Sequence, residues 1–210
     1  MQITNSSKAF LWMIVILGWF ALISQCYLII ENRVAPVPET IIRYFSFFTI
    51  LTNLLVAICC TTLLSKSDNF LKNFFSKQTT LTAIAVYITI VGSVYNIILR
   101  FLWKPEGLQW VVDEILHSII PVLFILVWLF FIPRGKIAGK SVLAWLLYPL
   151  IYLILILSRG HYSSFYPYPF IDVSKIGFNK TLVNSAGMLL AFLVVSILFI
   201  ALNRLKKPAL

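Results

Sequence analysis

Apolar side chains run along this chain in six long blocks, which short polar segments separate. The blocks cover roughly residues 9–30, 41–64, 81–102, 111–132, 142–158 and 181–203. A helix of about twenty residues crosses ~30 Å of hydrocarbon, whereas a membrane β-strand alternates over about ten residues. The pattern therefore predicts an all-α fold: a polytopic membrane protein built as a six-transmembrane-helix bundle.

Composition leaves no room for a separate soluble domain. Of the 210 residues, 60% are hydrophobic and 11% are charged, whereas soluble domains are about half apolar and roughly a quarter charged. The first block is too long for the core of a signal peptide, so we expect it to be retained. We expect residues 1–210 to form one transmembrane domain with the lipid bilayer as its main partner.

The net charge of +10 would suggest nucleic acid in a soluble protein, but its distribution indicates membrane topology instead. If odd helices run outward, ten of the 17 basic residues and one acid, Asp68, face inward. The inward residues are Lys8, Lys66, Lys72, Lys77, Arg134, Lys136, Lys140, Arg204, Lys206 and Lys207. By the positive-inside rule, both termini are then cytoplasmic. We expect a multi-pass protein of the plasma membrane, or of the inner membrane in a bacterium, that binds no nucleic acid.

Polar residues inside the blocks gather in the predicted outer half. Counted from the outer ends of their spans, Thr49 lies ~12 Å deep and His117 ~9 Å deep. Asn96 and Arg100 reach the same half from the third span, and Gln25 from the first. Polar groups are costly in a membrane, so this one-sided cluster suggests function.

Helical spacing places several of these residues on common faces. Three such faces are expected, formed by Ser46, Thr49 and Asn53, by Gly92, Asn96 and Arg100, and by Asp113, His117 and Pro121. Because proline has no N–H, the carbonyl of His117 loses its helical partner and the fourth span is expected to kink.

Thr49 and His117 together suggest nucleophilic catalysis. A threonine hydroxyl becomes a nucleophile when a neutral imidazole takes its proton, and a carboxylate such as Asp113 can orient the ring. Asn53 or Asn96 could donate to an oxyanion, and Arg100 could hold a substrate carboxylate. A site that opens to the outer leaflet favours a fatty-acyl ester as the substrate.

No cofactor or metal is expected at this site. His117 is the one histidine within a span, the three cysteines lie on other helices, and His161 belongs to a loop. Metal and haem sites need several such ligands close together.

The long outer segment, residues 159–180, is rich in aromatic residues and proline. Pro167 and Pro169 favour extended conformations at Tyr166 and Tyr168. One interpretation is an aromatic belt at the membrane surface. The other is a lid over an outward-facing cavity, and the two are compatible.

Three motifs carry a resemblance: RYFSFFTILTNLL at 43–55, HSIIP at 117–121 and YPYPFID at 166–172. With six spans in this order, the chain resembles the bacterial Pr-six-Pr membrane proteins, which are similar to the animal androgen-induced-protein (FAR-type) family. That resemblance implies a threonine of the second span and a histidine of the fourth that hydrolyse fatty-acid esters of hydroxy fatty acids. The histidine is His117 and the threonine is Thr49, with Thr52 as the alternative because Asn53 follows Thr49 by four residues rather than three.

Two functions stay open at this point. The first is a threonine- and histidine-dependent lipid-ester hydrolase with Asn53, Asn96 and Arg100 around the substrate. The second is a membrane protein that binds or transports a lipid or small molecule in the same cavity without catalysis. Internal inverted repeats or discontinuous helices would favour transport, and the sequence shows no clear sign of either.

Overall fold

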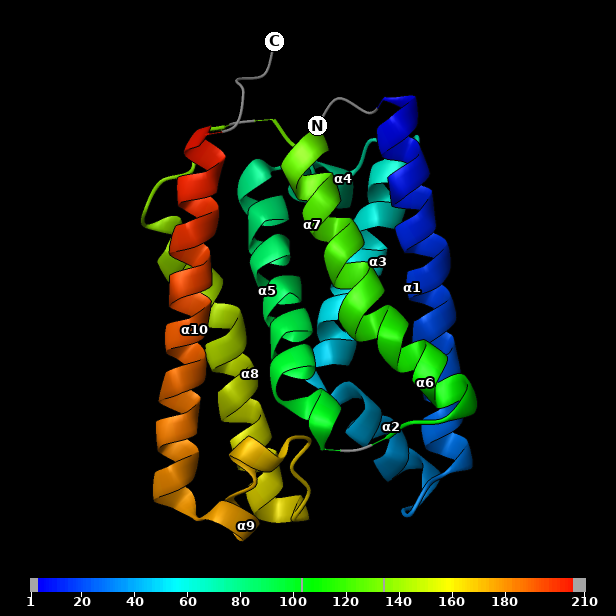
Figure 1. Ribbon diagram of the computed structural model, residues 1–210, viewed down its shortest axis with the longest axis vertical. Coiled ribbons are helices and arrows are strands. Elements are labelled where there is room, and N and C mark those ends of the chain that lie inside the picture. Colours follow the sequence, from blue (N-terminus) through cyan, green and yellow to red (C-terminus); the bar gives the residue numbers. More distant parts are fainter. Residues whose placement is uncertain (1–3, 103, 134, 206–210) are drawn as a thin grey trace.

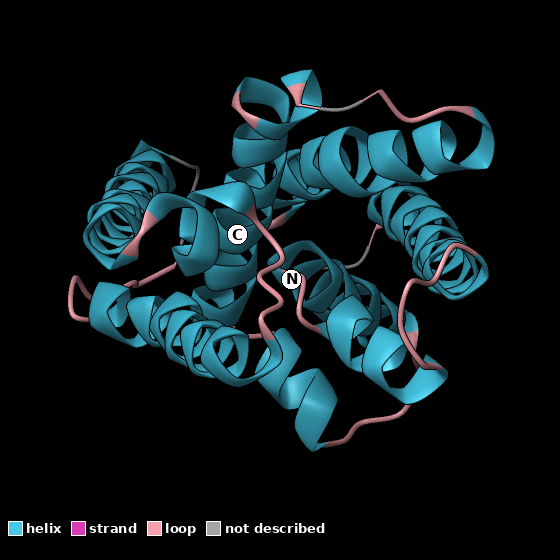
Figure 2. Ribbon diagram, turned by 90° about the horizontal axis from the view of Figure 1, so that it is seen from below, coloured by secondary structure: helices cyan, strands magenta, loops and turns pink. Residues whose placement is uncertain are grey.

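The computed structural model describes residues 4–102, 104–133 and 135–205. All regular structure within these ranges is helical (Figures 1 and 2). Arg134, Lys206 and Lys207, which contribute to the charge asymmetry, lie outside the described residues.

Five long apolar segments are able to cross a membrane. They are α1 (Asn5–Glu31), α5 with the 3₁₀ turn η1 (Gln78–Phe101), α6 with α7 (Gly107–Phe131), α8 (Ser141–Ser163) and α10 (Phe178–Leu205). A bent pair, α2 (Val37–Phe45) and α3 (Phe48–Leu64), makes a sixth if it is one span. The predicted all-α fold is confirmed, and the length and apolar composition of these helices are consistent with a multi-pass membrane protein.

The second predicted span, residues 41–64, is broken. Helices α2 and α3 meet at an angle of 71° around Ser46 and Phe47. The Ser46 hydroxyl donates to the carbonyl of Ile42 at 2.7 Å, which favours bending, and the Ser46 carbonyl accepts from the Tyr152 hydroxyl of α8 at 2.8 Å. Ser46 and Thr49 therefore do not share one helical face, as the sequence pattern had predicted.

Helix α5 lies at the centre of the bundle, packed against α3, α7 and α10 (Figure 1). Its most apolar stretch is 67% buried, against 22% for α8 and 28% for α1 and α10. The outer helices expose large apolar side chains, among them Ile16, Leu143, Leu155, Leu190 and Ile197. Helices that are apolar on their outward faces as well suit a lipid environment.

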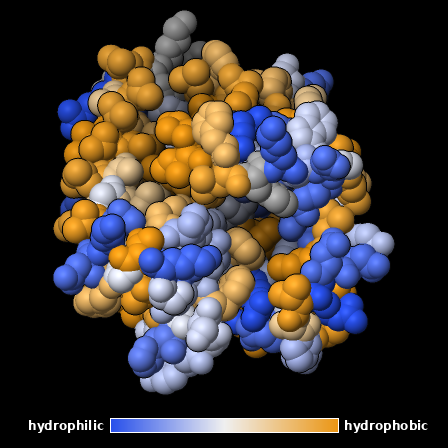
Figure 3. All heavy atoms as spheres, turned by 60° about the horizontal axis from the view of Figure 1, so that its bottom comes forward, coloured by the Kyte–Doolittle hydropathy of each residue, from blue (hydrophilic) through white to orange (hydrophobic). Residues whose placement is uncertain are grey.

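The start of α1 and the end of α10 lie at the same end of the bundle (Figure 1). The short helix α4 (Phe70–Phe75) and residues 135–140 share this end, so the described segments with inward basic residues are together. The opposite end carries α2, the 3₁₀ turn η3 (Pro169–Ile171) and α9 (Val173–Ile176), and polar side chains gather there (Figure 3). That this opposite end faces outward remains a prediction.

Candidate active site

Two cavities meet around Thr49 and His117, in the half of the bundle that carries α2. The apolar cavity, about 70 Å³, lies between α5, α8 and α10, with Val91, Leu153 and Met188 in its wall. The polar-ended cavity, about 340 Å³, extends toward α1 and α6 and reaches Gln25, Gln109 and Asp113. Four residues line both cavities: Thr49, Leu99, His117 and Tyr168.

Thr49 is the second residue of α3, because the chain breaks just before it. The residue that precedes the helix, Phe47, has extended backbone and no side chain that caps the first turn. The first N–H groups of a helix have no intrahelical partner and carry partial positive charge. The N–H of Thr49 donates instead to the Tyr168 hydroxyl at 3.2 Å, and the Thr49 Oγ1 lies 3.4 Å from the same hydroxyl.

Tyr168 comes from the loop between α8 and α10. Burial raises the pKa of its hydroxyl above the ordinary value, although hydrogen bonds from the Thr49 side chain and backbone and from the Phe48 backbone oppose the shift. The hydroxyl therefore keeps its proton at neutral pH. While it accepts from the Thr49 N–H, it retains one O–H to donate.

His117 lies in a π-helical turn, Ile115–Ile119, between α6 and α7. Its ring stacks on Tyr95 with centroids 4.0 Å apart, and its Nδ1 lies 2.9 Å from the Asp113 carbonyl oxygen. A carbonyl only accepts, so Nδ1 carries the proton and Nε2 presents a lone pair. No other described residue hydrogen-bonds to Nε2, and a neutral imidazole in this tautomer can accept a proton there.

Asn53 and Asn96 hold this π turn from two sides. The Asn96 amide donates to the His117 carbonyl at 3.1 Å, the group that Pro121 leaves without a helical partner. The Asn53 amide donates to the Leu116 carbonyl at 3.1 Å. Each amide also donates to its own helix, to Thr49 and Gly92 respectively, so both NH₂ groups are engaged. These contacts hold the turn that carries His117.

Gly92 allows α5 to approach this turn closely. A Cβ at that position would lie 3.0 Å from the Cβ of Pro121 and 3.2 Å from the His117 carbonyl oxygen. A larger residue would push α5 away and lengthen the hydrogen bond from Asn96.

Arg100 does not line either cavity. Its guanidinium pairs with Glu114 at 2.6 Å, donates to Asn96 and Ser118, and lies over the ring of Tyr95. Arg100 was expected to bind a substrate carboxylate, but its positive charge is balanced by Glu114.

The Asp113 carboxylate has partners other than the His117 ring among the described residues. It accepts from Gln109 at 3.0 Å and lies 3.5 Å from the Tyr95 hydroxyl. The backbone carbonyl of Asp113 orients His117, in place of the side chain that the helical spacing suggested. The carboxylate is left to line the polar-ended cavity.

Thr52, the alternative nucleophile, is fully buried about one turn farther along α3. Its hydroxyl lies 3.4 Å from the Tyr148 hydroxyl, and it lines neither cavity. Geometry thus favours Thr49 over Thr52 as a residue that can meet His117.

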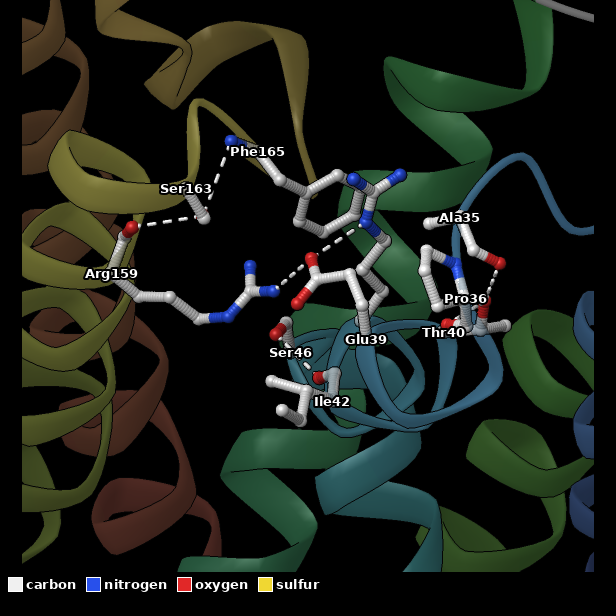
Figure 4. A network of polar contacts seen from close by, with 10 residues as sticks. Ala35, Pro36, Glu39, Thr40, Ile42, Ser46, Arg159, Ser163 and Phe165 are labelled. Atoms are coloured by element: carbon white, nitrogen blue, oxygen red, sulfur yellow. Dashed lines mark hydrogen bonds and ion pairs between the residues drawn. The ribbon is translucent and has the colours of Figure 1, made fainter.

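The loop that carries Tyr168 is fastened at several points. The guanidiniums of Arg43 and Arg159 both lie over the Phe165 ring, and both pair with Glu39 (Figure 4). Farther along, the Asn184 amide donates to the Phe170 carbonyl at 2.9 Å. The loop residues Pro167 and Pro169 line the polar-ended cavity, while Phe170 and Ile171 line the apolar one. This arrangement fits the interpretation of the loop as a lid.

Sequence reasoning missed Tyr168 and Gln109 as site residues. Tyr168 looked like one of several interfacial aromatic residues, and Gln109 stood before the predicted span. The spacing of Gln109 and Asp113, one helical turn apart, was the available signal.

Comparison of this chain with protein-family models, with curated proteins and with solved structures gives no match. The resemblance to the Pr-six-Pr and FAR-type families therefore rests on the three sequence motifs alone.

Proposed function

We propose that this protein is an intramembrane hydrolase of fatty-acyl esters in which Thr49 is the nucleophile and His117 the general base. One observation carries the proposal: two residues from different spans line the same two cavities, where the histidine Nε2 is free to accept a proton. Intramembrane groups of this kind are costly to keep without a role.

The first half-reaction forms an acyl-enzyme. The Thr49 Oγ attacks the ester carbonyl carbon, Nε2 of His117 takes the hydroxyl proton, and the carbonyl electrons move onto oxygen. Tyr168 donates its O–H to this oxyanion, next to the partial positive charge at the start of α3. The intermediate collapses, the C–O bond to the alcohol half breaks, and the imidazolium protonates the departing alkoxide.

The second half-reaction returns the enzyme to its starting state. A water molecule gives a proton to Nε2 as its oxygen attacks the acyl carbon. The bond from that carbon to Thr49 Oγ then breaks, and the imidazolium returns a proton to the hydroxyl. The products are a fatty acid and an alcohol, and the atoms balance with one water consumed.

The lining of the apolar cavity suits the start of an acyl chain, and its volume of about 70 Å³ holds only part of a medium-length one. Its wall is formed by aliphatic and aromatic side chains of α5, α8 and α10, including Ile90, Val94 and Phe192. An ester whose chain enters there brings its carbonyl to the junction with the polar-ended cavity, where Thr49 and His117 lie. Lipid from the predicted outer leaflet is the natural source.

The test is ester turnover by the purified protein in nanodiscs. Wild type should hydrolyse medium- or long-chain acyl esters and react with a fluorophosphonate probe, and Thr49→Ala should lose both. Thr52→Ala is the matched control, since it removes the same hydroxyl one turn away outside the cavities. His117→Ala should cost about as much as Thr49→Ala, and the double variant little more, because the two act as one unit. Full turnover in both single variants would falsify the proposal.

A second candidate is binding or transport of a lipid or small molecule without catalysis. The break between α2 and α3 favours it, because discontinuous helices often form substrate sites in transporters. Tight lipid binding by wild type, with no turnover across a broad panel of esters, would establish this candidate instead.

A further inference from the structure

We propose that the polar-ended cavity recognises a positively charged amino group on the alcohol half of the ester, through the Asp113 carboxylate. This inference deepens the proposed function by naming the substrate class, since it assigns the second cavity to the part of the substrate beyond the scissile bond. The site is formed by Asp113, Gln109 and Gln25, and aromatic side chains line the same cavity.

The carboxylate is buried and without a cationic partner among the described residues. Asp113 is 5% exposed, and no described Lys, Arg or His lies within ion-pair distance of it. The nearby guanidinium of Arg100 is bound to Glu114 outside both cavities. A buried charge normally needs a partner of opposite sign, and an ammonium group from a ligand would supply it.

The hydrogen-bonding capacity of this carboxylate is also incomplete. Oδ1 accepts from the Gln109 amide at 3.0 Å, and Oδ2 has only the Tyr95 hydroxyl at 3.5 Å. A carboxylate can accept about four hydrogen bonds. Gln109 is itself held by Gln25 of α1 at 2.8 Å, so the carboxylate is fixed in position at the end of the cavity.

The surrounding wall suits a cation better than an anion. Tyr44, Phe47, Tyr95 and Tyr168 contribute aromatic rings to the cavity, and aromatic faces attract ammonium groups. The histidine Nε2 at the other end is an acceptor. A substrate carboxylate would instead meet the negative charge of Asp113.

The position of the two cavities relative to Thr49 and His117 indicates which half of the substrate each cavity holds. Thr49 and His117 lie where the cavities join, so the acyl chain and the alcohol half extend in different directions from the carbonyl. With the acyl chain in the apolar cavity, the alcohol half reaches toward Asp113. The preferred substrates are accordingly acyl esters of amino alcohols rather than esters of hydroxy acids.

Binding of three probes with one chain and different head groups tests the site without any turnover. Octylammonium, octanol and octanoate are titrated calorimetrically into wild-type protein in phosphatidylcholine nanodiscs, with empty nanodiscs subtracted. Octylammonium should bind about tenfold more tightly than octanol, the difference expected for a charge-assisted hydrogen bond, and octanoate most weakly. Equal binding of the three, or a preference for octanoate, overturns the proposal.

Two variants locate the effect. Asp113→Asn keeps the backbone carbonyl that orients His117 and should abolish the preference for octylammonium over octanol. Glu114→Gln, the matched control, removes the adjacent carboxylate outside the cavity and should retain it. If Asp113→Asn still prefers octylammonium over octanol, the assignment is wrong. If that variant does not fold, the order in which wild type binds the three probes still decides.

A turnover measurement separates this inference from the proposed function. Octanoyl esters of ethanolamine, of glycerol and of glycolate share one acyl chain and differ in the alcohol half. Wild type should prefer the ethanolamine ester by about tenfold in kcat/KM over the glycerol ester. Ammonium binding without turnover of any ester would reject the hydrolase and retain the site, whereas turnover that favours glycolate would do the reverse.

Discussion

The hydroxyl of Tyr168 lies 3.2 Å from the backbone nitrogen of Thr49 and 3.4 Å from its Oγ1, although 119 residues separate them in the chain. Under the proposed mechanism, a hydroxyl in this position would donate to the oxyanion formed on a carbonyl that Thr49 attacks. It also links the lid loop directly to the start of α3. Catalytic competence would thus depend on the lid being closed.

Removal of the Tyr168 hydroxyl should slow turnover more than it weakens substrate binding. Tyr168→Phe keeps the ring between the two cavities and deletes one oxyanion donor, which typically costs about 10²–10³ in kcat. KM for an octanoyl ester should change little, because the oxyanion exists only in the transition state. Tyr162→Phe, on a side chain that is 87% exposed, is the control. A rise in KM at unchanged kcat would show that Tyr168 only positions the substrate.

Loss of the Asn96 side chain should loosen the π turn that carries His117. In Asn96→Ala the His117 carbonyl is left without a partner, which costs about 1–3 kcal/mol for a buried group. Asn32→Ala deletes a similar amide-to-carbonyl hydrogen bond, to Leu28 at 2.9 Å, but at an exposed helix end where water replaces it. Thermal unfolding in detergent should show a clear decrease in midpoint for Asn96→Ala and almost none for Asn32→Ala. Equal shifts would argue against a special role for the Asn96 contact.

A methyl group at Gly160 should displace the lid. The Cβ of alanine at this position in α8 would overlap the ring of Tyr166, so the loop must move. Overpacking of this kind costs about 1–3 kcal/mol. Both the stability and the rate of ester turnover should decrease. Turnover is affected because Tyr168, two residues from Tyr166, would move away from Thr49.

The matched control for this substitution is Gly187→Ala. Nothing lies within 4 Å of a Cβ at Gly187 in α10, so alanine there should be neutral or more stable by up to about 1 kcal/mol through helix propensity. Turnover and the unfolding midpoint are measured for both variants. If Gly160→Ala behaves like Gly187→Ala, the loop is not held by this contact.

Cysteine labelling should place the lid outside the cell. On a background without the three native cysteines, Tyr162→Cys should react with an impermeant maleimide added to intact cells, and Ser67→Cys only after permeabilisation. Both positions are exposed; Tyr162 belongs to the last turn of α8 and Ser67 to the link between α3 and α4, which lie at opposite ends of the bundle. The expected orientation follows from the basic residues near the α4 end. The reverse pattern of labelling would invert the topology and place the site toward the cytoplasm.

The apolar blocks by themselves determined a large part of this fold. Their lengths require helices, because lipid offers no partner for unpaired backbone groups, and the structure has helices over each block. The position of Pro121 four residues after His117 likewise marked a carbonyl without a helical partner. Helix formation and the unpaired carbonyl both depend on residues that are close together in the sequence, so the sequence alone reveals them.

The break between α2 and α3 could not be predicted in this way. No glycine or proline lies at Ser46 and Phe47, and the bend is held by the hydroxyl of Tyr152 from α8. Because of the break, Thr49 is placed at the start of a helix, where its N–H is free to bind another group. A contact made across about a hundred residues decides the chemistry available at Thr49.

The partners of the remaining polar residues were also decided by tertiary packing. The sequence marked Asn53, Asn96, Arg100 and Asp113 as unusual, because such residues are rare inside membrane spans. It did not determine that the two amides hold the π turn, that Glu114 balances Arg100, or that Asp113 has no cationic partner among the described residues. Periodicity gives the face of a helix on which a side chain lies, whereas the group that it meets depends on how neighbouring helices rotate and approach one another.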